Sequence, residues 1–273
     1  MDQSRSKASK VILVTGASSG IGKATAIALA EAGHRVFAGV RKPSEAIVHP
    51  LVELVKLDVT NPDDVVSAVA HVEREAGRLD VLVNNAGTSL VGAVEETSDK
   101  EASSLFQTNF FGPLRLSRAV LPLMRRQGQG LIVNVSSVLG FLPAPFMGLY
   151  ASSKHALEGL SESLDHEVRS FGVRVILVEP SFTRTSLDTN ASVASTGIDE
   201  YAAARSKSVA AVRRQIAEAP PPSGVAAEIL SVIDGKHHLR RPADRRARIL
   251  SKLRRWVPAA QFDKSLRASF GLS

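Results

Sequence analysis

Tyr150 and Lys154 lie four residues apart in the segment YASSK, and Ser137 lies thirteen residues before Tyr150, at the end of an apolar run. On a helix, residues four apart share one face, with Cβ atoms about 5–6 Å apart. The ammonium can then favour the ionised form of the phenol, whose ordinary pKa of about 10 makes it a poor proton shuttle at neutral pH. This pair suits proton transfer to or from an alcohol oxygen. Because such a pair also arises by chance, it needs support from other motifs.

A glycine-rich turn gives that support near the start of the chain. The segment TGASSGIG, from Thr15 to Gly22, follows the apolar run Val11–Val14 and opens a helical pattern. Glycines let a backbone approach a pyrophosphate, whose charge then meets the N-terminus of the helix. A strand, a turn and a helix in this order are what a dinucleotide site requires. The turn is not a P-loop, because Ala17 and Ala24 replace residues that a P-loop needs, so ATP chemistry is disfavoured.

The end of the second predicted strand indicates which dinucleotide binds. An acid there would bind the ribose 2′-hydroxyl, whereas an Arg accommodates a 2′-phosphate. Val40 stands near the place of the acid, and Arg41 and Lys42 follow it. This favours NADP(H) over NAD(H), with ordinary solvated surface cations as the alternative.

Apolar runs that alternate with amphipathic helical stretches must position these residues. The predicted strands are Val11–Val14, Arg35–Val40, Leu54–Leu57, Val81–Val83, Leu131–Val135 and Val173–Val178, with a weaker one near His238–Arg240. The predicted helices are roughly 20–32, 62–76, 99–127 and 150–171, with stop signals at Gly33, Gly77, Gly128 and Gly172. This alternation predicts an α/β fold, a doubly wound parallel sheet of the Rossmann type in a single domain.

Two segments depart from the alternation. Residues 182–222 are small, polar and irregular and end in three prolines, which indicates a mobile substrate lid, with a surface excursion as the alternative. We assign residues 1–241 to a catalytic domain that includes this lid, and 242–273 to a basic amphipathic helical tail. The tail has helically spaced apolar residues, among them Ile249, Leu253 and Trp256, with Arg and Lys around them. It could pack on the domain or a partner subunit, lie on an anionic membrane, or bind nucleic acid.

Composition narrows the class of protein. The 273 residues include no Cys, which excludes disulfides and thiolate chemistry and fits a reducing, cytoplasmic setting. No apolar run is long enough to span a membrane, so we expect a soluble or at most membrane-peripheral protein. The net charge is +7, but residues 236–273 carry +9 and the remainder −2, so we expect no nucleic-acid partner. We also expect no metal site.

Taken together, these motifs resemble the short-chain dehydrogenase/reductase family. The turn from Thr15 to Gly22 is similar to its Thr-Gly-x-x-x-Gly-x-Gly element, and Asn84–Gly87 to its Asn-Asn-Ala-Gly element. The segment Val178–Thr185 is similar to its Pro-Gly-x-x-x-Thr element, except that Ser181 replaces Gly and leaves the local backbone angles in doubt. The resemblance covers roughly residues 10 to 185 and fades in the lid and tail.

The resemblance implies roles for individual residues. The catalytic set would be Asn109, Ser137, Tyr150 and Lys154: Tyr150 exchanges a proton with the substrate oxygen, Ser137 donates to that oxygen, Lys154 holds the ribose, and Asn109 fixes a relay water or has a packing role. Ser136 is the rival of Ser137. Asn84 and Asn85 could tie strands together. The cofactor-binding residues would be Gly16, Ser18, Ser19, Gly20, Ile21, Gly22, Arg41, Asp58, Val59, Asn85, Ala86, Gly87, Tyr150, Lys154, Pro180, Thr183 and Thr185.

The substrate is indicated by the apolar residues between Ser137 and Tyr150, which include Phe141, Phe146 and Met147, together with Leu90 and Val91. This part resembles the branch of the family that acts on steroids, retinols and other lipophilic alcohols. The resemblance implies an NADP(H)-dependent oxidoreductase that interconverts a lipophilic secondary alcohol and its ketone or aldehyde, as a homodimer or homotetramer. The alternative from another class is a catalytically silent dinucleotide-binding sensor.

Overall fold

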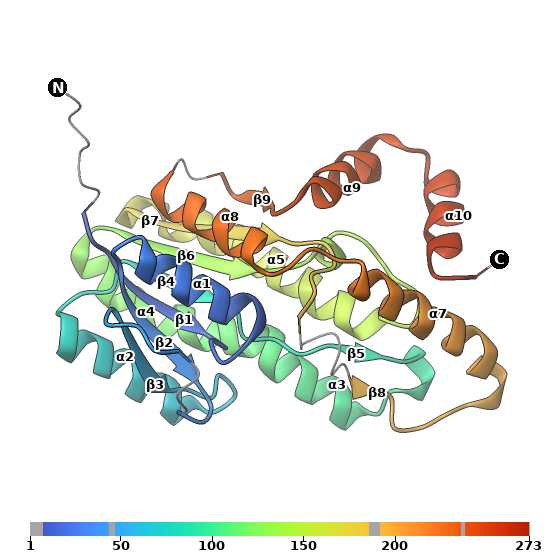
Figure 1. Ribbon diagram of the computed structural model, residues 1–273, viewed down its shortest axis with the longest axis horizontal. Coiled ribbons are helices and arrows are strands. Elements are labelled where there is room, and N and C mark those ends of the chain that lie inside the picture. The colour runs from blue at the N-terminus through green and yellow to red at the C-terminus, as the bar shows by residue number, and fades with distance from the viewer. Residues whose placement is uncertain (1–7, 44–46, 186–191, 236–237, 273) are drawn as a thin grey trace.

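A seven-stranded parallel sheet forms the centre of the protein, for which a computed structural model describes residues 8–43, 47–185, 192–235 and 238–272 (Figure 1). Its order is β3-β2-β1-β4-β6-β7-β9, and every neighbouring pair is parallel. The strands are β1 (Val11–Thr15), β2 (Arg35–Val40), β3 (Val52–Lys56), β4 (Val81–Asn84), β6 (Gly130–Val135), β7 (Val173–Glu179) and β9 (Arg240–Pro242). The predicted doubly wound sheet is confirmed, including its weak last strand.

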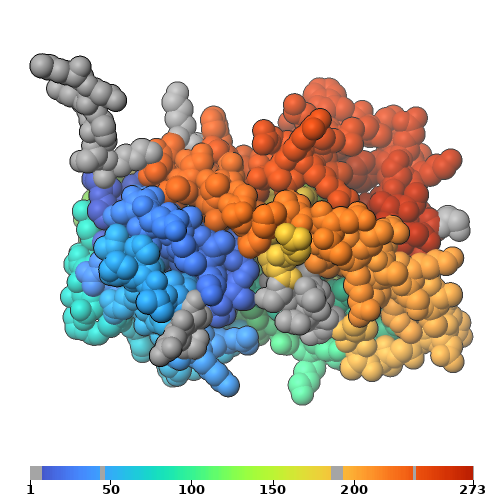
Figure 2. Space-filling view, in the orientation of Figure 1, coloured from blue at the N-terminus to red at the C-terminus, as the bar shows by residue number. Residues whose placement is uncertain are grey.

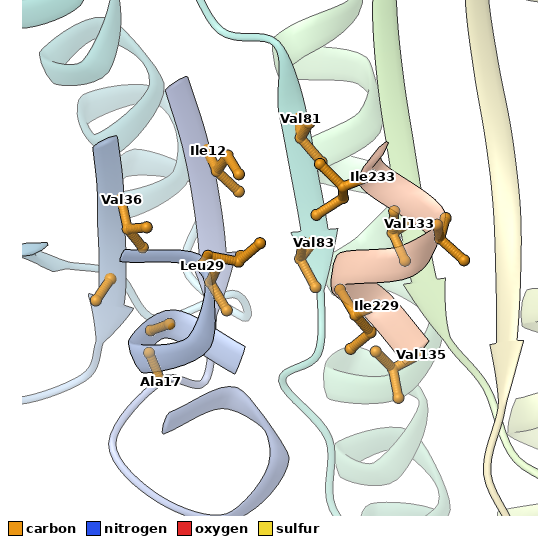
Figure 3. Close-up of a cluster of buried hydrophobic side chains, with 14 of the residues drawn as sticks. Ile12, Ala17, Leu29, Val36, Val81, Val83, Val133, Val135, Ile229 and Ile233 are labelled. Carbon is orange, nitrogen blue, oxygen red and sulfur yellow. The ribbon is translucent and has the colours of Figure 1, made fainter. Parts of the chain in front are cut away.

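Helices cover both faces of this sheet. On one face lie α1 (Gly20–Glu31) and α8 (Ser223–Asp234), and on the other α2 (Pro62–Ala76), α4 (Gly112–Gln127) and α5 (Gly148–Val168). Successive residues of a strand point to opposite faces, so Ile12 packs towards α1 and α8 while Leu13 packs towards α2 and α4. Figure 3 shows the first cluster, with Leu29 of α1 and Ile229 and Ile233 of α8 over the strand residues. The four predicted stop signals each follow a helix end.

The helix predicted over 99–127 is interrupted. It consists of α3 (Asp99–Phe106), a π-helical turn (Gln107–Phe111) and α4. Ser98 begins α3 with a capping box, in which its hydroxyl and the Glu101 carboxylate satisfy each other's backbone N–H. A π turn shifts the hydrogen-bond register by one residue and often marks a functional position. Asn109 lies within it.

The prediction of irregular structure over 182–222 is wrong for the second half of this segment. Helix α7 (Asp199–Ala217) fills it, and β8 (Ser192–Val193) pairs with β5 (Leu90–Val91) in a separate two-stranded sheet. Ala, Arg and Gln form helices readily, but the buried stripe of α7 includes Ser208 and Ala211, too small to give a strong apolar period. Residues 186–191 of the predicted lid and 1–7 at the N-terminus lie outside the described residues.

The tail predicted from residue 242 is helical. It contains α9 (Arg245–Trp256) and α10 (Ala259–Ser269), which extend to one end of the molecule (Figure 1). Asp244 caps α9 by accepting a hydrogen bond from the Ala247 amide. Short 3-10 turns occur at Val94–Glu96, Val138–Gly140 and Arg169–Phe171. Among the described residues, no helix is both long and apolar enough to cross a membrane.

Candidate active site

The carboxyl ends of the central strands open onto a cleft of about 620 Å³. A parallel sheet of this type binds ligands at this edge, where the strand order reverses between β1 and β4. Most predicted site residues line the cleft: Gly16, Ser18, Ser19, Gly20, Ile21, Arg41, Asp58, Val59, Asn85, Ala86, Gly87, Ser137, Tyr150, Lys154, Thr183 and Thr185. Gly22, Asn109 and Pro180 are not in its lining.

The turn between β1 and α1 has glycine where the backbone is most crowded. Gly16 has a φ of +64°, and a Cβ on it would lie 2.8 Å from the Ala86 Cα. A Cβ on Gly22 would lie 2.3 Å from the Gly16 carbonyl oxygen and 2.4 Å from the Asn85 Nδ2. Glycine at position 22 therefore lets the turn approach the N-terminus of α1 closely, where a pyrophosphate would be stabilised.

Asn84 and Asn85 tie neighbouring strands together, as interpreted from the sequence. The Thr15 hydroxyl oxygen accepts hydrogen bonds from the amides of Asn85 and Ala86, at 3.0 and 2.9 Å. The Asn85 side chain donates to the Thr15 carbonyl at 2.9 Å, and that of Asn84 donates to Asn134 Oδ1 at 2.8 Å. These bonds lock β4 to β1 and β6, so the floor of the cleft is rigid.

Ser137, Tyr150 and Lys154 face the same cleft from two elements. Tyr150 and Lys154 lie in the first turns of α5, both largely buried, with the Lys154 Nζ 5.9 Å from the Tyr150 ring centroid. Nζ also donates to the Val135 carbonyl at 2.9 Å, which fixes the ammonium beside the end of β6. Ser137 follows β6 and its Oγ accepts a hydrogen bond from the Leu139 amide at 3.1 Å. Two hydroxyls and a cation thus line one cleft.

The Asn109 side chain is engaged by protein groups. Its Oδ1 accepts from the Thr88 amide at 2.9 Å, and its Nδ2 donates to the Thr88 carbonyl at 2.9 Å and to the Ser153 Oγ at 3.0 Å. Both amide protons are used, so the donors of this side chain cannot also hold a relay water. The geometry agrees with the packing role, and the relay role stays a prediction.

Behind Ser137 lies a charged network with two buried carboxylates that the sequence did not reveal. The Ser136 hydroxyl donates to Glu158 Oε1 at 2.7 Å, which separates its role from that of Ser137. The Arg240 Nη1 donates to both Glu158 and Glu179, at 2.5 Å each. Burial and the nearby Glu158 charge raise the pKa of Glu179 to about 7, against the opposing charge of Arg240. A signal was present: Glu158 lies one turn after Lys154, on the same face of α5.

We expect Glu179 to make the protein less stable as the pH rises from about 5 to 7. In this range the folded protein keeps the Glu179 proton while the unfolded chain, with an ordinary pKa of 4.5, loses it. The free energy of unfolding then falls with pH, by at most about 1.4 kcal/mol per unit from this group. Chemical denaturation of wild type and Glu179→Gln at pH 5, 6, 7 and 8 measures this. The difference between the two proteins should change across these pH values, and a constant difference would contradict the assignment.

Ser181 adopts ordinary backbone angles, which answers the doubt raised by its replacement of Gly. Among the described non-glycine residues, only Phe146 has a positive φ, at 59°. The Ser181 amide donates to Asp244 Oδ2 at 2.8 Å, so the residue that caps α9 also holds the segment after β7. Ser181 itself lines the cleft.

The apolar residues that indicated a lipophilic substrate pack together beside the cleft. Leu90, Val91, Phe141, Phe146 and Met147 belong to a hydrophobic cluster that includes Tyr150 and residues of α7, α9 and α10. None of these five residues lines the 620 Å³ cleft. The cleft thus has the lining of a dinucleotide site, and the apolar cluster lies on the Tyr150 side of it.

Comparison with known proteins identifies the family. The family model described as short chain dehydrogenase matches residues 10–195. The chain belongs to the short-chain dehydrogenase/reductase family. It is an oxidoreductase that acts on alcohol and carbonyl groups with a nicotinamide dinucleotide, and the resemblance seen in the sequence is confirmed.

Other members of the short-chain dehydrogenase/reductase family resemble most of the chain. A 3-ketodihydrosphingosine reductase of Bacteroides thetaiotaomicron is 38% identical over 96% of this chain and 98% of its own length. A short-chain dehydrogenase of Streptomyces avermitilis has a crystal structure that is similar with a TM-score of 0.81 and 38% identity, over 97% of this chain and 100% of that one.

Two further family structures contain a cofactor. That from Burkholderia phymatum is a complex with NAD, with a TM-score of 0.79 and 27% identity over 90% of this chain and 92% of its own. That from Burkholderia cenocepacia is a complex with NADP, with a TM-score of 0.74 and 27% identity over 96% of this chain and 97% of its own. The family therefore uses either dinucleotide, and the choice depends on residues near the ribose.

Proposed function

We propose that the protein is an NADP(H)-dependent oxidoreductase that interconverts a lipophilic secondary alcohol and its ketone or aldehyde. The observation that carries this proposal is the convergence of Ser137, Tyr150 and Lys154 on the cleft that also contains the glycine-rich turn. The alternative, a silent dinucleotide-binding sensor, would need none of these three groups. The lid and domain assignments from the sequence, 182–222 and 1–241, are part of the proposal.

In this mechanism the Tyr150 hydroxyl donates a proton to the carbonyl oxygen during reduction and accepts it during oxidation. Ser137 Oγ–H donates a hydrogen bond to the same oxygen as negative charge develops. Lys154, held by the Val135 carbonyl, stabilises the phenolate left after proton transfer. A nicotinamide held beside these residues would supply or accept the hydride. Residues of the turn from Gly16 to Gly22 would hold its pyrophosphate, and Asp58 would meet the adenine.

Arg41 supports the preference for NADP(H). It lines the cleft at the end of β2, is exposed, and follows Val40, where an acid would bind the ribose 2′-hydroxyl. We expect Arg41→Ala to lose at least about tenfold in kcat/KM with NADPH, because it removes a charge-assisted contact to the 2′-phosphate. With NADH the change should be small.

Steady-state kinetics with both cofactors measure this effect. Lys42→Ala is the matched control, because Lys42 is also exposed but is not in the cleft lining, so it should retain most NADPH efficiency. Equal efficiency of the wild type with both cofactors, or equal losses in Arg41→Ala with both, would contradict the preference.

The lipophilic substrate is supported by the apolar cluster around Tyr150 and by the name of the Bacteroides relative, a 3-ketodihydrosphingosine reductase. NADPH oxidation screened over ketones and aldehydes, including steroids, retinal and long-chain 3-keto compounds, tests it. Turnover of small polar carbonyls alone would refute this part of the proposal.

We also propose a homodimer or homotetramer that pairs through α4 and α5. Phe111, at the start of this helical region, is exposed and stacks edge-on with Phe110, so an apolar contact is available there. Light scattering coupled to gel filtration gives the oligomeric state directly.

A further inference from the structure

Helix α9 is fixed to the domain by one face. Ala247 is fully buried and Leu250 is partly buried against the hydrophobic cluster that includes Leu139 and Tyr150. Asp244 caps the helix and binds the Ser181 amide. Contacts with residues next to the active site therefore hold α9 in place.

The opposite face of α9 is apolar and exposed. Ile249, Leu253 and Trp256 follow each other at helical spacing and are 46%, 41% and 80% exposed. They are three of the ten large hydrophobic side chains that are exposed in the described part of the chain, so this short helix concentrates them. Figures 1 and 2 show α9 and α10 at the outer edge of the molecule, with α9 directly after the edge strand β9.

Cations share this exposed face. Arg245, Arg248 and Lys252 surround a hollow of about 370 Å³ next to Ile249, and no described carboxylate pairs with them. Elsewhere on the helix, Arg246 bonds to Gln215 and Arg254 lies over the Phe262 ring, so they are engaged within the protein. Residues Arg245–Trp256 include six cations and no acid.

We propose that this face of α9, which we call the docking face (Arg245, Arg248, Ile249, Lys252, Leu253 and Trp256), binds the surface of an anionic phospholipid bilayer. Cations flanking apolar side chains fit such a surface, because lipid phosphates attract the cations while the apolar side chains enter the acyl boundary. Trp is favoured at this interface for its apolar ring and polar N–H. The three cations line one open depression, where they can attract lipid phosphate.

Other occupants fit this face less well. In a symmetric dimer the same face would meet itself, so the cations would oppose cations. Nucleic-acid phosphates would satisfy the cations but would give Ile249 and Leu253 nothing apolar to contact. A bilayer satisfies both kinds of side chain.

The docking face also indicates how the substrate reaches the active site, an inference that rests on the proposed function. The buried face of α9 packs on the cluster beside Tyr150, so a bilayer on the docking face lies one helix away from the substrate side of the site. A lipophilic substrate could then enter from the membrane without crossing water.

Flotation of the full-length protein with vesicles tests the inference without any substrate. One set contains phosphatidylcholine with about 30% phosphatidylglycerol, and the other phosphatidylcholine alone. We expect flotation with the anionic set only, weakened by raising the salt from about 0.1 M to 0.5 M, because salt screens exposed charges. Arg248→Glu/Lys252→Glu should weaken partitioning at least about tenfold, and Trp256→Ser should weaken it several-fold.

The matched control is Lys42→Glu/Lys100→Glu, which makes the same charge change at exposed positions after β2 and in α3 and should float like wild type. Circular dichroism checks that each variant is folded. Equal flotation with neutral vesicles, no flotation, or the same loss in the control would overturn the inference. Tight binding of a single-stranded RNA that is unaffected by Trp256→Ser would overturn it in favour of a polyanion surface. The substrate screen has no vesicles, so its failure would overturn the proposed function alone.

Discussion

Tyr150→Phe should lose at least about a hundredfold, and up to about ten-thousandfold, in kcat. The substitution removes only the hydroxyl, so the ring and the Lys154 contact to the Val135 carbonyl can persist while the proton donor is gone. General acid/base catalysis contributes about 10²–10⁴-fold, which corresponds to roughly 3–5 kcal/mol of transition-state stabilisation. Single-turnover reduction of an active ketone measures the loss, and NADPH fluorescence titration shows whether the cofactor still binds.

Tyr201→Phe is the matched control, because Tyr201 is the other tyrosine of the chain. Its hydroxyl donates to Glu95 at 2.9 Å on the surface, away from the cleft lining. Removal of the Tyr201 hydroxyl should leave kcat within about twofold of the wild-type value. Activity of Tyr150→Phe within about tenfold of wild type would exclude Tyr150 as the proton donor.

Gly22→Ala should weaken NADPH binding by about tenfold to a hundredfold. The added methyl group would lie 2.3 Å from the Gly16 carbonyl oxygen, so the glycine-rich turn and α1 must move apart. Overpacking of this kind costs about 1–3 kcal/mol, and the displaced turn is the one expected to hold the pyrophosphate. Fluorescence titration with NADPH gives the dissociation constant.

Gly159→Ala provides the comparison for this change. Gly159 lies in α5, and a Cβ there meets nothing within 4 Å, so the substitution should leave NADPH affinity unchanged and stabilise the helix slightly. If Gly22→Ala bound NADPH as tightly as Gly159→Ala does, the close approach at Gly22 would not be required for the site.

Much of the fold could be predicted from the sequence because its signals are local. Buried strands such as β1 and β4 are short apolar runs, and glycines mark the helix ends. Helix α7 could not be predicted, because two of its buried side chains, Ser208 and Ala211, are small and its apolar period is weak. The π turn was not predicted either, and its buried residue Asn109 bonds to Thr88 and Ser153, which are distant in the sequence.

The candidate site also has parts that could be predicted from the sequence and parts that could not. The turn from Gly16 to Gly22 and the Tyr150–Lys154 pair are recognisable because each lies within one element and its spacing is fixed by that element. The Ser136–Glu158–Arg240–Glu179 network was missed, since it joins four elements from distant parts of the sequence. The prediction that Asn84 and Asn85 tie neighbouring strands together is correct. The hydrogen-bond partners of Asn109 could be identified only in the folded structure.

The contact between α1 and α8 has a consequence during synthesis of the protein. Leu29, next to the end of α1, packs with Ile229 and Ile233, so two segments about 200 residues apart close one core (Figure 3). Until α8 has left the ribosome, the side of α1 that faces α8 has no cover, although the turn expected to hold the pyrophosphate is translated long before α8. Contacts so distant in sequence form late, and nascent chains that expose apolar surface need chaperones. We expect dinucleotide binding to appear only in ribosome-bound chains whose emerged part extends beyond residue 234.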